Sequence, residues 1–201
     1  MSPSGTESID GSVRIIDLRR AGPAERRQTA QLLVDAFRDM APDAWPDLVA
    51  ADAEIEEGLS PDRIGRIAVG EHGDVLGWIG GIPSYGGKVW EIHPLAVRPE
   101  SQGRGIGRAL VAHLEDLVAE RGGVTLWLGS DDEAGMTSLG GVDLYPNVLE
   151  KLKAIRNLKR HPFEFYRRIG FEVVGVMPDA NGFGKPDILL AKRVTRSAAA
   201  R

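Results

Sequence analysis

The chain has 201 residues, of which 42% are hydrophobic and 27% are charged, as is ordinary for a globular protein with one hydrophobic core. It contains no cysteine, so disulfides, thiolate metal sites and a cysteine nucleophile are excluded. The formal net charge of -4 argues against a general nucleic-acid-binding protein, and no apolar run reaches the roughly 20 residues of a membrane span.

The N-terminal half of the chain alternates between extended and helical patterns. Residues 1–11 are polar and lack the apolar core of a signal peptide, so we expect a disordered lead-in and a cytoplasmic protein. We expect strands at residues 13–18, 66–69, 75–82 and 89–97. We expect helices at residues 23–37, 47–59 and 105–121, the last with an apolar stripe of Ile106, Leu110, Leu114 and Leu117.

The C-terminal half predicts a second set of strands and helices. Strands are expected at residues 124–128, 171–177 and 188–192, and helices at 145–158 and 162–169, with a polar excursion at 130–143. The basic residues between 151 and 160 alternate with leucine and isoleucine, which is typical of the solvated face of an amphipathic helix. Together the elements predict an α/β (α+β) fold. We expect one domain over residues 12–194, with a mixed, mostly antiparallel sheet, helices on both faces and a flexible tail at 195–201.

Residues 98–107 form a glycine-containing turn between a strand and an amphipathic helix. A helix begins with unpaired N–H groups that carry partial positive charge, and glycines let a ligand approach them, so the turn predicts a phosphate or pyrophosphate site. Gly107-Arg108-Ala109 lacks the Lys-Ser/Thr of a P-loop, and the turn follows antiparallel strands rather than the first strand of a βαβ dinucleotide fold. The plain alternative is a helix start at which glycines relieve crowding.

The spacing of Gln102, Gly105 and Gly107 fits the pattern Gln/Arg-x-x-Gly-x-Gly/Ala and closely resembles the pyrophosphate turn of the GNAT superfamily of N-acetyltransferases. The resemblance implies the GNAT fold, with acetyl-coenzyme A as cofactor. It also implies that the cofactor contacts the turn residues Gln102, Gly103, Arg104, Gly105, Ile106 and Gly107.

The strand before this turn has a further expected role. Strand alternation places Glu91, His93, Leu95 and Val97 on one side of the sheet. Pro94 cannot donate to a strand ladder, so we expect a bulge or an unpaired stretch near it. The resemblance implies that the N–H groups of Leu95 and Val97 contact the pantetheine arm of the cofactor, and that the N–H of Leu95 donates to the thioester oxygen.

Longer stretches resemble one branch of the superfamily, the aminoglycoside 6'-N-acetyltransferases. These stretches are 79–86, 90–95, 128–132, 161–166 and 181–188. The resemblance runs from about Leu32 to Lys192 and implies a small cationic amine as acceptor, in particular the 6'-amine of an aminoglycoside. Phe183 stands where the branch would have Trp, a difference that bears on the acceptor pocket or on a subunit contact. Because the family is commonly dimeric, the resemblance also implies a homodimer.

An amine at neutral pH is mostly ammonium and must lose its proton before it attacks a thioester. Glu91 is the candidate base by position and by resemblance, and His93 is a candidate to relay a proton or to shape the pocket. Tyr166 resembles the superfamily tyrosine that lies near the coenzyme sulfur. The structural alternatives are an ion pair for Glu91, a structural histidine for His93 and a ring packed between helix and sheet for Tyr166. With no cysteine in the chain, we favour direct transfer in a ternary complex.

Negatively charged side chains are expected to hold an acceptor that carries several positive charges. Asp131 and Asp132 follow the strand expected to flank the cofactor cleft and form the favoured pair. Asp187 and Tyr85 complete the candidate acceptor contacts. Acidic loop residues are usually only solvated, and this interpretation stays open for each.

Two other functions stay open at this point. The first is an acetyltransferase whose acceptor is a polyamine, an amino acid or a peptide or protein amine. Only acceptor kinetics can distinguish this enzyme from one that acts on an aminoglycoside. The second is a non-catalytic acyl-coenzyme A sensor. Such a sensor would keep the turn but would not need Glu91 or Tyr166, so their presence favours an enzyme.

Overall fold

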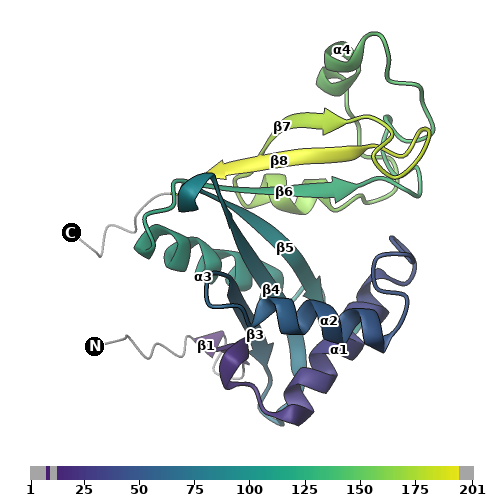
Figure 1. Ribbon diagram of the computed structural model, residues 1–201. Helices are drawn as coiled ribbons and strands as arrows, with labels where there is room; N and C mark the ends of the chain where they lie inside the picture. The colour runs from purple at the N-terminus through teal and green to yellow at the C-terminus, as the bar shows by residue number, and fades with distance from the viewer. Residues whose placement is uncertain (1–7, 10–12, 195–201) are drawn as a thin grey trace. The chain divides into compact units, whose positions relative to one another are not determined.

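The computed structural model describes residues 8–9 and 13–194, which belong to two compact units, one formed by the chain up to Val124 with Val194 and the other by Thr125–Arg193. The first unit has an antiparallel sheet whose strands lie in chain order (Figure 1). They are β1 (Ser8–Ile9), β2 (Val13–Asp17), β3 (Ile64–Val69), β4 (Val75–Ser84) and β5 (Val89–Val97).

The predicted lead-in is partly wrong, because Ser8 and Ile9 pair with Arg14 and Val13 of β2. The rest of the lead-in and the predicted tail at 195–201 lie outside the described residues. The single acetyltransferase domain over 12–194 stays a prediction.

Three predicted helices of the first unit are confirmed almost to the residue. They are α1 (Pro23–Phe37), α2 (Leu48–Gly58) and α3 (Ile106–Glu120). Local signals explain two of the starts. Glu25 accepts the Gly22 N–H at 2.7 Å before α1, and Asp47 accepts the Ala50 N–H at 2.9 Å at the start of α2.

Helices pack on both faces of this sheet, as predicted. On one face the ring of Trp78 is fully buried in a core formed with α1 and α2. On the other face, added Cβ atoms at Gly77 and Gly81 would lie 3.0 Å and 2.8 Å from Leu110 and Leu114 of α3. Side chains at these two β4 positions would therefore push α3 away, so the glycines permit its close approach.

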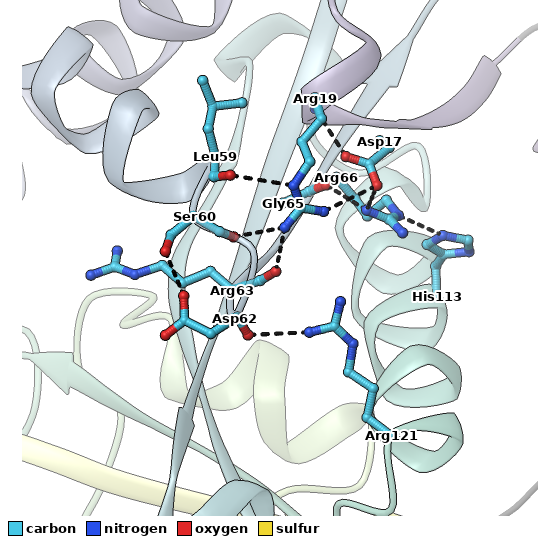
Figure 2. A network of polar contacts seen from close by, with 10 residues as sticks. All are labelled: Asp17, Arg19, Leu59, Ser60, Asp62, Arg63, Gly65, Arg66, His113 and Arg121. Carbon is cyan, nitrogen blue, oxygen red and sulfur yellow. Dashed lines mark hydrogen bonds and ion pairs between the residues drawn. The ribbon is translucent and has the colours of Figure 1, made fainter.

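A polar network fixes the end of α2 against β2, β3 and α3 (Figure 2). The Arg19 guanidinium donates to the carbonyls of Ser60 and Arg63 at 2.7 Å and 2.9 Å. The Arg66 guanidinium lies 2.8 Å from the Asp17 carboxylate. Cations near a helix C-terminus stabilise its unpaired carbonyls, so this arginine-rich network serves the fold.

The second unit contains a three-stranded antiparallel sheet in which β8 (Asp187–Arg193) lies between β6 (Thr125–Asp131) and β7 (Glu172–Met177) (Figure 1). It also contains the short helices α4 (Val148–Lys153) and α5 (Phe163–Arg168). Strand β6 extends to Asp131, so Ser130 and Asp131 belong to a strand and not to the predicted polar excursion.

The predicted helix at 145–158 is wrong in length, since only α4 is helical within it. Beyond α4 the backbone pairs with an earlier segment: the Ser138 N–H donates to the Arg156 carbonyl at 3.0 Å, and the Leu158 N–H donates to the Met136 carbonyl at 2.8 Å. These non-local hydrogen bonds replace the helical ones that the apolar spacing had suggested. Over the described residues, no helix combines the length and apolar character needed to cross a membrane.

Candidate functional site

The turn between β5 and α3 presents backbone to an approaching ligand. Gly103 and Gly105 have φ angles of 76° and 86°, in the left-handed region that glycine adopts without strain. A Cβ placed on either glycine would meet no atom within 4 Å, so the space beside both is open. The Gln102 amide donates to the Val97 carbonyl at 3.3 Å and ties the turn to the end of β5.

The start of α3 adds hydrogen-bond donors to this turn. Gly105 is the N-cap residue and supplies no side-chain cap, and the first turn of α3 contains no acidic residue. The N–H groups of Ile106 and Gly107 point out of the helix start, where intrahelical acceptors are lacking. With open space beside the glycines, the residues fit the pyrophosphate of coenzyme A, whose negative charge the helix dipole favours.

Strand β5 carries the predicted bulge. Ile79 of β4 pairs with Leu95, but Gly81 pairs with Ile92, so β5 has one extra residue over this interval. Gly80 lies opposite the bulge, and an added Cβ there would overlap the His93 carbonyl. A bulge next to Pro94 is therefore confirmed, and it interrupts the strand ladder where an extended ligand is expected.

Because of the bulge, the prediction that the four β5 residues Glu91, His93, Leu95 and Val97 lie on one side of the sheet is wrong. His93 contacts Glu54 of α2, and Glu91 lies two residues before it on the same side. Beyond the bulge, Val97 pairs with Gly77, which faces α3, and Leu95 is two residues from Val97. Glu91 and His93 therefore share the side of α1 and α2, here termed the Glu91 face, whereas Leu95 and Val97 lie on the α3 side.

The Glu91 face gathers two residues that the sequence analysis missed. The Glu54 carboxylate lies 3.6 Å from His93 Nε2, and the Trp45 ring packs against the His93 ring with centroids 5.6 Å apart. The interaction with Glu54 raises the pKa of His93 more than burial lowers it, and the nearby Glu91 raises it further. No local signal identifies Glu54, since acidic residues on an amphipathic helix usually face solvent.

Tyr85 lies in the 3-10 turn Tyr85–Gly87 that joins β4 to β5, and it is 83% exposed. This exposure leaves its ring accessible to an acceptor. It therefore stays a predicted acceptor contact.

In the second unit, Tyr166 lies on α5 and is buried. Its ring packs edge-on against Phe165 and Phe171, with centroids 5.1 Å and 5.7 Å apart. Burial strongly raises the pKa of Tyr166, so its hydroxyl keeps its proton at neutral pH. A neutral phenol of this kind is suited to donate a hydrogen bond or a proton to a departing thiolate.

The two adjacent aspartates at the end of β6 have different surroundings. Asp131 is exposed, and its carboxylate accepts a hydrogen bond from the Asn181 amide. Asp132 is only 1% exposed, and its carboxylate accepts from the Met136 N–H and from both the N–H and the hydroxyl of Thr137. The geometry therefore gives Asp132 a structural role within the loop and leaves Asp131 as the available acid.

Asp187 begins β8 directly opposite Asp131 in the strand register. The two carboxylates add negative charge to this end of the strand pair. Asp131 and Asp187 therefore lie opposite one another on neighbouring strands of the second unit, and their role as acceptor contacts stays a prediction.

His161 is a buried residue of the second unit that the sequence analysis did not single out individually. Its Nδ1 accepts the Phe163 N–H at 3.2 Å, which leaves Nε2 as the donor to the Asp131 carbonyl at 2.9 Å. Burial lowers the pKa of His161, in agreement with this neutral tautomer. Through these bonds His161 connects the acidic end of β6 to the start of α5, which carries Tyr166.

The described part of the chain has no group of three or more His, Asp or Glu side chains able to hold a metal ion. The first unit offers a phosphate-binding turn and a carboxylate beside a histidine, and the second unit offers a neutral buried phenol.

Comparisons with known proteins agree with this geometry. Residues 27–140 match the model of the Acetyltransferase (GNAT) family. A crystal structure of an aminoglycoside 6'-N-acetyltransferase complexed with coenzyme A has a TM-score of 0.82 and 40% identity, and the match covers 91% of this chain and 98% of that one. The aminoglycoside 6'-N-acetyltransferase from Enterococcus faecium has a TM-score of 0.80 and 39% identity, with the same coverage.

A curated relative, a streptothricin acetyltransferase of Streptomyces lavendulae, is 36% identical over 85 residues. That match spans 42% of this chain and 45% of the relative, so less than half of the relative's length is covered. The family-model match and the two structures that cover nearly the whole chain confirm the expected fold. The chain therefore belongs to the GNAT family of acetyltransferases.

Proposed function

We propose that this GNAT acetyltransferase transfers an acetyl group from acetyl-coenzyme A to the 6'-amine of an aminoglycoside and thereby inactivates the antibiotic. One observation carries the proposal: the two aminoglycoside 6'-N-acetyltransferase structures are 40% and 39% identical to the chain and match 91% of it. The exposed Asp131 and the cross-strand Asp187 add negative charge that suits a polycationic acceptor.

Bound acetyl-coenzyme A supplies the acetyl group as a thioester. The turn at Gly103–Gly107 and the start of α3 hold its pyrophosphate. The N–H groups of Leu95 and Val97 bind its pantetheine arm on the strand interrupted by the bulge. This assignment uses backbone donors of β5, which lie in the plane of the sheet, whereas the carboxylate of Glu91 projects from one face.

Glu91 takes the proton of the acceptor ammonium, directly or through a water molecule, so that the neutral amine attacks the thioester carbonyl. The Leu95 N–H stabilises the negative charge that develops on the carbonyl oxygen. The Tyr166 hydroxyl, which its raised pKa keeps protonated, donates a hydrogen bond to the departing sulfur, and the thiolate takes its proton from solvent. Transfer is direct, and no acetylated side chain of the protein is required.

A second candidate acceptor is streptothricin, which the name of the curated Streptomyces relative suggests. This alternative keeps the cofactor and the chemistry and changes only the amine. Polyamines and amino acid or peptide amines are further acceptors of the same chemical class.

The test is acetyl-coenzyme A turnover, measured as free thiol released, with a kanamycin-type aminoglycoside, its 6'-hydroxy analogue, streptothricin and spermidine. We expect turnover with the 6'-amine and its loss with the 6'-hydroxyl. Turnover with streptothricin or spermidine alone would reject the aminoglycoside assignment, and cofactor binding without turnover on any amine would favour a sensor.

We further propose a homodimer in the cytoplasm, on the basis of the family resemblance and of the sequence. Phe183, which replaces the Trp expected there, is 79% exposed and is a candidate for a subunit contact. Light scattering coupled to gel filtration would measure the mass in solution, and a monomer that retains full activity would reject the dimer.

A further inference from the structure

The contact between Glu54 and His93 joins helix α2 to strand β5 on the Glu91 face. The Glu54 side chain is 14% exposed, and its Oε2 lies 3.6 Å from His93 Nε2. Its Oε1 lies 3.6 Å from the Arg63 guanidinium. A carboxylate that is largely removed from water needs such cationic partners, so Glu54 favours the protonated form of His93.

An aromatic contact also fixes the His93 imidazole ring. Trp45 packs against it, and Trp45 is itself fixed edge-on by Phe37, with ring centroids 4.6 Å apart. Three charged groups act on His93: Glu54 of α2 and Glu91 of its own strand favour its protonated form, whereas Arg63 of the segment after α2 opposes it, as burial does. His93 is therefore held between an aromatic ring and a carboxylate, beside the candidate base.

We propose that Glu54 is a positioning residue that fixes the His93 imidazole on the Glu91 face and controls the charge that an incoming acceptor meets there. Its effect on the acceptor rests on the proposed function, whereas its effect on His93 does not. In this proposal neither Glu54 nor His93 transfers a proton to the substrate, and Glu54 acts through His93.

The expected consequence follows from charge. Loss of the His93 proton makes the Glu91 face one unit more negative, which favours a cationic acceptor. Acceptor binding should therefore strengthen as the pH rises through the pKa of His93 in the folded protein. Because Glu54 raises this pKa, its removal should move the change to lower pH.

The chain offers a matched control for this experiment. Glu57 lies one turn from Glu54 on α2 and contacts the same Arg63 guanidinium at 2.7 Å. Glu57→Gln therefore removes a carboxylate partner of Arg63 and leaves the Glu54–His93 contact in place. Glu54→Gln removes the negative charge from both contacts of Glu54 with little change in volume.

The first measurement is an NMR titration of the four histidine side chains in the wild type, Glu54→Gln and Glu57→Gln. We expect the pKa of His93 to fall in Glu54→Gln and to stay at its wild-type value in Glu57→Gln. An unchanged pKa in Glu54→Gln, or an equal fall in both variants, would overturn the inference. If Glu54→Gln does not fold, Glu54→Asp is measured instead, for which a smaller fall is expected and no fall is the contrary result.

The second measurement is the pH dependence of kcat and of the acceptor KM in the same variants. We expect Glu54→Gln to shift the acidic rise in KM to lower pH, with a smaller effect on kcat. A shift in the kcat profile alone would overturn the charge-control role. If the NMR result is as expected but no aminoglycoside is turned over, the proposed function fails and the Glu54–His93 assignment stands.

Discussion

Replacement of Asp132 by Asn tests whether this aspartate builds the loop or binds the acceptor. The buried carboxylate accepts three hydrogen bonds, from the Met136 N–H at 2.5 Å, the Thr137 N–H at 2.8 Å and the Thr137 hydroxyl at 2.7 Å. An amide retains one accepting oxygen and turns its NH2 group toward a backbone N–H. We expect the free energy of unfolding to fall by about 3–5 kcal/mol, because one buried donor loses its acceptor and the other hydrogen bonds lose their charged partner.

For a chain of this length, each kcal/mol lowers Tm by about 2–4 °C, so the expected fall is roughly 6–20 °C. Differential scanning calorimetry measures it, and acceptor kinetics are measured below the melting range. The matched control is Asp131→Asn, at an exposed neighbour, for which we expect less than about 0.5 kcal/mol of destabilisation and a raised acceptor KM. An Asp132→Asn protein with unchanged Tm and a raised KM would refute the structural role and restore Asp132 as an acceptor contact.

Three further predictions concern the turn, the buried histidine and the phenol. Gly105→Ala places a side chain at a φ of 86°, which costs about 1–2 kcal/mol and favours a different conformation of the turn. Because the present conformation is the one expected to bind the pyrophosphate, we expect coenzyme A affinity, measured by calorimetry, to weaken by about tenfold. Unchanged affinity would contradict the turn assignment. Because burial lowers the pKa of His161, its contribution to stability is present above the unfolded value of 6.5 and is lost as pH falls through its lower folded pKa. Melting curves across pH 5–8 should therefore show stability rising more steeply with pH in the wild type than in His161→Gln, and equal slopes would contradict this expectation. Tyr166→Phe should lower kcat by about 10²-fold with unchanged coenzyme A affinity, and unchanged kcat would exclude its hydroxyl as the group that stabilises the departing sulfur.

Most elements of the first unit could be predicted from the sequence, because their signals are local. The caps before α1 and α2 and the glycines before α3 all act within a few residues. The predicted helix at 145–158 was too long, since its second half forms backbone hydrogen bonds with residues 136 and 138. An apolar period carries no information about such a partner.

In the candidate site, too, the features set by local sequence could be predicted and those set by distant residues could not. The phosphate turn and the bulge near Pro94 follow from glycine and proline chemistry, which acts on the backbone wherever these residues stand. The buried state of Asp132 could not be predicted, because its three donors come from a loop whose course is set by the rest of the second unit.

By itself, the sequence determined the order of strands and helices, the phosphate-binding turn and the residue types available for acetyl transfer. Only the tertiary structure decided which side of the sheet each residue takes. The extra residue in β5 turns Leu95 and Val97 away from Glu91 and His93, and packing of α2 brings Glu54 to His93. The physical reason is that strand register and burial depend on contacts between residues far apart in the chain, whereas sequence periodicity reports only on neighbours.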